Sequence, residues 1–348
     1  MNSTRSPSIY TVATAGFEAA CQISALAPGH RASRLHGHGF KVKVRARLPE
    51  GWARFTGSED DDLLEHVQEV VSPLDHRYLN DILDNPTNEN IARWVAGKLD
   101  IVADKIAVQS TPGEGVDIDR FGNAHVWRVF SFEAAHQLPN VEPGHQCGRM
   151  HGHGFEVILH AHQSLGSADM AVDLDDLVKL WSRVAPELEY ACLNDIPGLE
   201  NPTSEHLCQW LWQRLKPEME VLSYVSVYET ATAGCHYDGH KFRIWKDFRF
   251  ESALSLQHAP EGEKRRRMHG HSYLARLHLQ AELDEVLGWT IDYGDVKSRF
   301  KPFLDQLDHH TLNTIAHLDI PSSSGIAEWI RMQLEHSLPE LDRICLLY

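Results

Sequence analysis

The chain of 348 residues is 42% hydrophobic and carries 49 acidic against 33 basic side chains, which gives a net charge of −16 at pH 7. So acidic a surface is a poor match for nucleic acid. No apolar run is long enough to cross a bilayer, and residues 1–10 lack the apolar core of a secretory signal. We therefore expect a cytoplasmic protein that binds neither nucleic acid nor membranes and whose partner is a small molecule.

Three short motifs recur along the chain in the same order, at intervals of about 115 residues. They are Phe-Glu at Phe17, Phe132 and Phe250, His-Gly-His at 36–38, 151–153 and 269–271, and Leu-Asn at 79–80, 193–194 and 312–313. Because three unrelated markers keep one register, we predict a tandem triplication with units at 1–120, 121–240 and 241–348. Glycine-containing segments at 113–115 and 234–239 are predicted to be the linkers between the units.

The middle unit shows most clearly which elements one unit contains. Apolar residues at helical spacing predict a helix over 174–184, and Asn201-Pro202-Thr203 marks the start of a second helix. Runs rich in β-branched and aromatic residues predict strands at 126–138, 154–163, 222–232 and 234–237. This order predicts the α+β class, with helices on one face of an antiparallel sheet.

The cysteines do not follow the repeat. The six residues are Cys21, Cys147, Cys192, Cys208, Cys235 and Cys345. A disulfide framework would recur with the units, so we expect free thiols in a reducing compartment.

The second His-Gly-His motif predicts a metal site. His151 and His153 are two residues apart, so on a strand both rings leave the same face. His136, on the strand before, would supply a third nitrogen. Three histidines with one open position are typical of a catalytic zinc site.

The residues around this motif carry a family resemblance. The middle unit closely resembles 6-carboxy-tetrahydropterin synthase, a relative of 6-pyruvoyl-tetrahydropterin synthase with the tunnelling fold. The similar segments are Phe132–His136, Cys147–His153, Leu193–Glu205 and Tyr228–Cys235. The short gap between Cys147 and His151 favours the carboxy-forming branch. The resemblance implies that the three units close into a twelve-stranded, pseudo-trimeric β-barrel with helices outside, and that two such rings stack as a homodimer.

The same resemblance implies the roles of further residues. Cys147 would be the catalytic base, Glu229 would anchor the pterin, and Zn²⁺ would be held by His136, His151 and His153. An Asp-His pair would come from a neighbouring unit, because the middle unit reads Glu189-Tyr190 at that position. Two pairs are available, Asp75-His76 and Asp308-His309, and the sequence does not choose between them. Thr203 is either a ring contact or the N-cap of a helix.

The outer units lack parts of this set. In the first unit Cys21 replaces His136, which leaves Cys21, His36 and His38 as a possible second zinc site. Ala32 replaces the catalytic cysteine there, and Ser110 aligns with Glu229. In the third unit Leu254 leaves only two histidines.

The third unit also carries an unusual run of cations. Lys264 to Arg267 occupy the place of the cysteine loop. This run is either a solvated surface loop or a contact for the triphosphate of the substrate, since arginine matches phosphate oxygens well.

We therefore expect a zinc-dependent lyase with one composite site per chain. The resemblance implies dihydroneopterin triphosphate as its substrate and 6-carboxy-tetrahydropterin as its product, in the route to 7-deazapurines such as queuosine. The alternatives are 6-pyruvoyl-tetrahydropterin synthase or another pterin side-chain lyase. A non-catalytic pterin-binding scaffold is the alternative from a different class, because two units have lost some of the residues of the implied active site.

Overall fold

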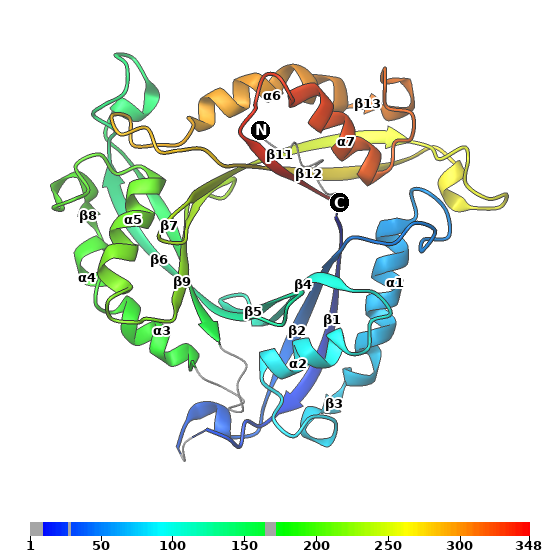
Figure 1. The fold of residues 1–348 in the computed structure, drawn as a ribbon, viewed down its shortest axis with the longest axis horizontal. Coiled ribbons are helices and arrows are strands. Elements are labelled where there is room, and N and C mark those ends of the chain that lie inside the picture. The colour runs from blue at the N-terminus through cyan, green and yellow to red at the C-terminus, as the bar shows by residue number, and fades with distance from the viewer. Residues whose placement is uncertain (1–9, 27–28, 164–171) are drawn as a thin grey trace.

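The computed structural model describes residues 10–26, 29–163 and 172–348. Long antiparallel strands curve around a central opening, and the helices lie on the outside of this ring (Figure 1). The helices are α1 (Glu59–Val71), α2 (Asn88–Ala96), α3 (Leu174–Trp181), α4 (Ala185–Leu188), α5 (Ser204–Leu215), α6 (Tyr293–Leu307) and α7 (Ser323–Leu334). None of the helices in the described part of the chain is long and apolar enough to cross a bilayer.

The strands form one sheet with the order β14-β12-β11-β10-β9-β7-β6-β5-β4-β2-β1-β3, and two short strands, β8 and β13, pair with β6 and β11. Their bounds are β1 (Thr11–Cys21), β2 (His36–Ala46), β3 (Arg77–Tyr78), β4 (Ala103–Thr111), β5 (Glu114–Asp119), β6 (Ala124–His136), β7 (His151–Gln163), β8 (Ala191–Cys192), β9 (Leu222–Thr230), β10 (Ala233–Tyr237), β11 (Phe242–Leu254), β12 (His269–Leu279), β13 (His310–Thr311) and β14 (Leu341–Leu347).

The three His-Gly-His motifs begin three equivalent strands. In each repeat the first strand pairs with the second in the same register, so Cys21 faces His36, His136 faces His151, and Leu254 faces His269. Figure 1 shows the three hairpins arranged around one axis. The α+β class and the outer position of the helices are confirmed.

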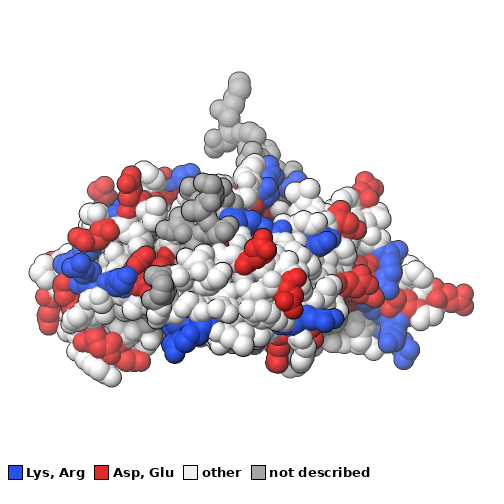
Figure 2. All heavy atoms as spheres, turned by 90° about the horizontal axis from the view of Figure 1, so that it is seen from below, with Lys and Arg blue, Asp and Glu red and all other residues white. Residues whose placement is uncertain are grey.

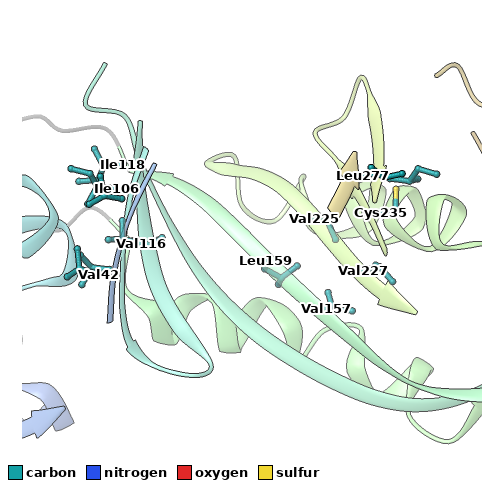
Figure 3. Close-up of a cluster of buried hydrophobic side chains, with 14 of the residues drawn as sticks. Val42, Ile106, Val116, Ile118, Val157, Leu159, Val225, Val227, Cys235 and Leu277 are labelled. Carbon is teal, nitrogen blue, oxygen red and sulfur yellow. The ribbon is translucent and has the colours of Figure 1, made fainter. Parts of the chain in front are cut away.

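The core lies between the sheet and the helices. Along β2, Val42 and Val44 are fully buried beneath the helices, whereas the alternating residues Lys41 and Lys43 are exposed on the inner face. Figure 3 shows Val42, Ile106 and Val116 from neighbouring strands pointing to one side, and the same packing continues around the sheet at Val157 and Val225. Strand alternation therefore gives an apolar outer face that the helices cover. Burial of this face stabilises the fold by roughly 25 cal/mol for each Å² of apolar surface removed from water.

Closure of the barrel is not confirmed. The sheet ends at β14 on one side and at β1 with β3 on the other, and no strand pairing joins β14 to β1 among the described residues. Thr11 on one strand and residues 341–346 on the other line one cavity of about 550 Å³. Side chains elsewhere join the first and third repeats: Arg265 forms an ion pair with Asp61, and His258 donates from Nε2 to the carbonyl of Thr56 at 2.7 Å. We call this junction between β14 and β1 the seam.

The expected linkers at 113–115 and 234–239 are wrong. Gly115 lies in β5 and Gly234 in β10, and these strands pair directly with the first strand of the next repeat. A Cβ on Gly115 would lie 2.6 Å from the Trp127 ring, and one on Gly234 would lie 2.3 Å from the Trp245 ring. Because neither glycine has a side chain, a tryptophan ring can pack directly against the strand. The sheet continues through both predicted boundaries between the units.

Candidate metal and active site

The three histidines of the middle repeat converge at the open end of the β6–β7 hairpin. His136 faces His151 across the pair of strands, and His153 leaves the same face of β7 two residues further along. The ring centroids lie 4.5 Å apart for His136 and His151, 5.2 Å for His136 and His153, and 5.0 Å for His151 and His153.

Hydrogen bonds orient two of these rings. Nδ1 of His136 lies 3.0 Å from the carbonyl of Pro202, and Nδ1 of His151 lies 2.8 Å from that of Arg149. A carbonyl can only accept, so each Nδ1 carries the proton and each Nε2 offers a lone pair. The buried Nε2 atoms of His136 and His153 have no hydrogen-bond partner. Three neutral imidazoles whose free lone pairs converge fit a divalent zinc ion.

Glu229 on β9 completes this group of ligand atoms, all within 4.8 Å of one another. Its Oε1 lies 3.4 Å from Nε2 of His153 and 3.6 Å from Nε2 of His136, long for hydrogen bonds. Burial opposes the charge on Glu229, but His153 and the other two histidines outweigh it, so the pKa of Glu229 is lowered. Burial lowers the pKa of His136, which keeps its ring in the neutral form that binds a metal.

A cavity of about 380 Å³ opens beside the histidines and is lined by two repeats. Cys147 and Glu229 come from the middle repeat, and Lys246, Trp289 and Tyr293 come from the next. Burial raises the pKa of the Cys147 thiol, and the nearby carboxylates of Glu229 and Asp292 raise it further. A positive charge near this thiol is therefore needed before it can act as a base at neutral pH.

The loop that carries Cys147 is fixed to the next repeat. His145 contacts Asp292 with Nε2 to Oδ2 at 3.1 Å, and its Nδ1 accepts a hydrogen bond from the backbone N–H of Cys147 at 3.2 Å. Asp292 in turn is the N-cap of α6. The position of the thiol therefore depends on the packing of one repeat against another.

Thr203 caps α5, because its hydroxyl accepts a hydrogen bond from the N–H of His206 at 3.1 Å. The hydroxyl also donates to the carbonyl of Gly288 at 2.5 Å. Glu205 was not singled out from the sequence, yet it is only 2% exposed and lines the cavity. Its Oε1 accepts from the N–H of Thr290 at 2.8 Å and from its hydroxyl at 3.0 Å, and burial raises the pKa of Glu205 to about 7.

Comparison with known proteins shows to which family the chain with this site belongs. The sequence profile of the family described as 6-pyruvoyl tetrahydropterin synthase matches the chain three times, over residues 11–118, 125–240 and 243–347. The chain belongs to this family, in three tandem copies. The triplication predicted from the recurring motifs is thereby confirmed.

Individual relatives cover about one copy each. A 6-carboxy-5,6,7,8-tetrahydropterin synthase from Synechocystis sp. is 38% identical over 119 residues, which is 32% of this chain and 91% of that protein. A dihydroneopterin monophosphate aldolase from Pyrococcus furiosus is 42% identical over 67 residues, 19% of this chain and 55% of that protein. The structure of Caenorhabditis elegans 6-pyruvoyl tetrahydropterin synthase aligns with 34% of this chain and 96% of its own, at 25% identity and a TM-score of 0.32.

The two Asp-His pairs of this chain have the same local structure. Asp75 lies 2.9 Å from Nδ1 of His76, and Asp308 lies 3.0 Å from Nδ1 of His309. Both histidines are 77% exposed and have a positive φ, as does Tyr190 at the same position of the middle copy. Neither pair is among the residues that line the cavity beside Cys147.

Strand pairing nevertheless distinguishes their positions. β12 occupies one edge of β11, so β13, which follows His309, lies along the other edge, the one that faces the middle copy. β2 occupies one edge of β1, so β3, which follows His76, lies along the edge at the seam. Asp308-His309 is thus directed toward the middle copy and Asp75-His76 toward the third.

The third copy has no comparable metal group in the part of the chain that the structure describes. Leu254 occupies the position of the first histidine, and the ring of Tyr348 lies 4.3 Å from that of His271. Arg265, the counterpart of Cys147, pairs with Asp61 and lies 5.5 Å from the centre of the Phe55 ring. Arg265 therefore belongs to the seam and is already engaged with a carboxylate.

Proposed function

We propose that the chain is a 6-carboxy-tetrahydropterin synthase that converts dihydroneopterin triphosphate at one composite zinc site, in the route to 7-deazapurines such as queuosine. The convergence of the Nε2 atoms of the middle copy beside Cys147 and Glu229 carries this proposal. The Synechocystis relative and the short gap between Cys147 and His151 favour the carboxy-forming reaction.

His136, His151 and His153 would hold the zinc ion. Bound zinc would coordinate side-chain oxygens of the pterin and make the adjacent C–H and O–H bonds more acidic. Cys147 takes a proton from the pterin side chain, since its thiol opens onto the same cavity. Glu229 and Glu205 accept hydrogen bonds from the amino-oxo edge of the ring, which fixes its orientation.

Asp308-His309 supplies the second proton-transfer group in this proposal. It lies on the edge of the third copy that faces the middle one, whereas Asp75-His76 lies at the seam. The contact of Asp308 with Nδ1 of His309 fixes the tautomer and leaves Nε2 for the substrate. The hydrogen bond from the backbone N–H of Glu251 to Asp308 lowers the pKa of Asp308, which keeps this carboxyl ionised.

Assembly and location form part of the same proposal. Units at 1–120 and 241–348 are degenerate copies, and the unit at 121–240 carries the zinc site. An exposed apolar residue precedes each His-Gly-His motif, Leu35 at 67%, Met150 at 51% and Met268 at 60%. These three residues favour a homodimer of stacked rings. On the face in Figure 2, acidic and basic side chains are interspersed, which agrees with a cytoplasmic protein that binds no nucleic acid or membrane.

The decisive experiment is incubation of the zinc-loaded protein with dihydroneopterin triphosphate, followed by identification of the products by mass spectrometry. We expect 6-carboxy-tetrahydropterin, free triphosphate and a two-carbon fragment. A 6-pyruvoyl product would identify the other branch of the family. Cleavage of the monophosphate alone would match the name of the Pyrococcus relative. Binding without any product would indicate a pterin-binding scaffold.

A further inference from the structure

We propose that the first copy holds a second metal ion through Cys21, His36 and His38, and that its pocket binds a pterin without converting it. The ligand class rests on the function proposed above, whereas the metal site does not. Sγ of Cys21 lies 3.5 Å from Nε2 of His36, and the possible ligand atoms of all three residues lie within 4.8 Å of one another.

The geometry of the pair of histidines is the same as in the middle copy. Nδ1 of His36 lies 2.6 Å from the carbonyl of Arg34, so the ring presents the lone pair of Nε2 to Cys21. The rings of His36 and His38 have centroids 5.1 Å apart and planes at 87°, against 5.0 Å and 86° for His151 and His153. Cys21 is 2% exposed and occupies the place of His136. Burial raises the pKa of the Cys21 thiol to about 11, so a metal ion must displace its proton; the resulting thiolate with two imidazoles is a good ligand set for zinc.

A second difference between the first and middle copies keeps the net charge around the metal the same in both. Gln109 pairs with Lys41 as Tyr228 pairs with Glu156, so the next residues, Ser110 and Glu229, are equivalent. In the middle copy a divalent ion, three neutral histidines and Glu229 sum to one positive charge. In the first copy the ion, the Cys21 thiolate, two neutral histidines and the neutral Ser110 sum to the same charge. The negative charge has moved from the carboxylate to the thiolate, as expected if metal binding was retained.

The pocket beside this centre keeps the binding groups and lacks the reactive ones. A cavity of about 280 Å³ is lined by the metal-site residues and by Thr87 and Glu89, the counterparts of Thr203 and Glu205. Glu89 is 4% exposed, and burial raises its pKa, as it does for Glu205. The chemistry therefore fits a flat amino-oxo heterocycle whose N–H groups reach Glu89 and whose side-chain oxygen reaches the metal.

Both proton-transfer groups are replaced in the first copy. Ala32 lies in its pocket at the position of Cys147. β8, which follows Tyr190, lies along the edge of β6 that faces the first copy, as β13 lies along β11. Tyr190 thus occupies the position equivalent to His309, so the first copy has no imidazole at that position. A bound pterin would meet a metal and a carboxylate, but no counterpart of Cys147 or of His309.

Metal binding can be tested without any assay of turnover. We expect two metal ions per chain in the purified protein, one in His151→Ala and one in Cys21→Ala. In protein loaded with Co²⁺, a thiolate-to-metal charge-transfer band should appear, persist in His151→Ala and Cys147→Ala, and vanish in Cys21→Ser. A single metal ion in the wild-type protein, or a band that survives in Cys21→Ser and vanishes in Cys147→Ala, would overturn the proposal.

The charge argument has its own test. The double variant Cys21→His, Ser110→Glu reproduces the ligand set of the middle copy, so we expect it to keep two metal ions and to lose the charge-transfer band. Cys21→His alone raises the charge of the centre by one and should bind the second ion more weakly. Equal affinity in the two variants would refute the compensating exchange.

Ligand binding is measured with pterin-6-carboxylate, which is fluorescent, in the His151→Ala background, where the middle site is disabled. We expect saturable binding of one equivalent that depends on metal and leaves the probe chemically unchanged. Glu89→Gln should weaken it by about tenfold or more through loss of a charged hydrogen bond. Absence of binding in metal-loaded His151→Ala would refute this pterin site even if the wild-type enzyme is active. Binding there together with an inactive wild type would count against the proposed function instead.

Discussion

Two glutamates line the cavity of the middle copy, and their surroundings shift their pKa values in opposite directions. Glu229 faces three histidines, which lower its pKa despite its burial. Glu205 meets only hydroxyl and backbone groups, so burial dominates and its pKa rises to about 7. At neutral pH one carboxyl is therefore fully charged while the other is close to half protonated.

The raised pKa of Glu205 predicts a pH-dependent stability. Between pH 4.5 and 7 the unfolded chain releases this proton while the folded protein keeps it, so the contribution of Glu205 to stability falls as pH rises through this window. The full difference corresponds to about 3 kcal/mol. Glu205→Gln should raise the melting temperature at pH 8 and have little effect near pH 4.5. An equal gain at both values of pH would show that the pKa is not raised.

Replacement of the proton-transfer groups separates catalysis from metal binding. Cys147→Ala should abolish turnover and retain the zinc of the middle site, because the thiol is not in the ligand group. His309→Ala should lower kcat by about 10²–10⁴-fold, as expected for loss of an acid–base group, and the matched variant His76→Ala should not. A severe loss in His76→Ala with an active His309→Ala would reverse the assignment derived from strand pairing.

The secondary-structure elements were the part that the sequence predicted best. Strands expected at 126–138 and 222–232 are β6 and β9, and the helix expected at 174–184 is α3, which ends at Trp181. For the segment at 234–239 the sequence predicts both a strand over 234–237 and a linker, because glycine usually marks turns; the strand is correct, and Gly234 lies in it against an aromatic ring. A close approach between strands is a tertiary contact, which local composition does not reveal.

These glycines should be sensitive to small side chains. A Cβ on Gly234 would lie 2.4 Å from the carbonyl oxygen of Val227 and 2.3 Å from the Trp245 ring, so Gly234→Ala should destabilise the fold by roughly 1–3 kcal/mol. Gly39 also lies in a strand, but nothing lies within 4 Å of its added Cβ. Gly39→Ala is thus the control, and chemical denaturation measures both. Similar stabilities for the two variants would contradict the close contact.

At the scale of the site, the recurring His-Gly-His motif pointed to His151 and His153, and the family resemblance pointed to Cys147 and Glu229. It did not identify Glu205, whose sequence context is an ordinary start of a helix and whose burial depends on Thr290 from the next copy. Nor could it choose between Asp75-His76 and Asp308-His309, since that choice follows from which edge of a strand each pair occupies.

Two of the three junctions between copies are continuous β-sheet, and the third lacks strand pairing among the described residues. β5 pairs with β6 and β10 pairs with β11, while β14 and β1 do not pair among the described residues and side-chain contacts outside these strands join the first and third copies. Arg265 is one of these contacts, and its guanidinium lies close to the carboxylates of Asp60 and Asp61. The cationic loop of the third copy thus contributes a structural contact with this residue.

Charge reversal at the seam should affect stability more than substrate recognition. Arg265→Glu places a third acidic group beside Asp60 and Asp61 and should lower the melting temperature, whereas Arg265→Glu with Asp61→Arg should restore part of it. Lys264→Glu is the matched control, because Lys264 is exposed and adjacent to Arg265 in sequence. A selective rise in KM for the triphosphate substrate in Arg265→Glu, with unchanged melting, would instead indicate a phosphate contact.

The seam also implies where the ring first opens. β1 and β14 have a strand partner on one side only along most of their length, and Thr11 and Leu341 at their ends line the cavity between them. Local opening there breaks the side-chain contacts and frays these two edge strands from β2 and β12. In native-state hydrogen exchange, the amides of these two strands should lose protection before those of β6 and β11, at a free energy below that of global unfolding. Since the three copies belong to one chain, such an opening is unimolecular. The ring can open locally at the seam, and dilution does not separate the three copies.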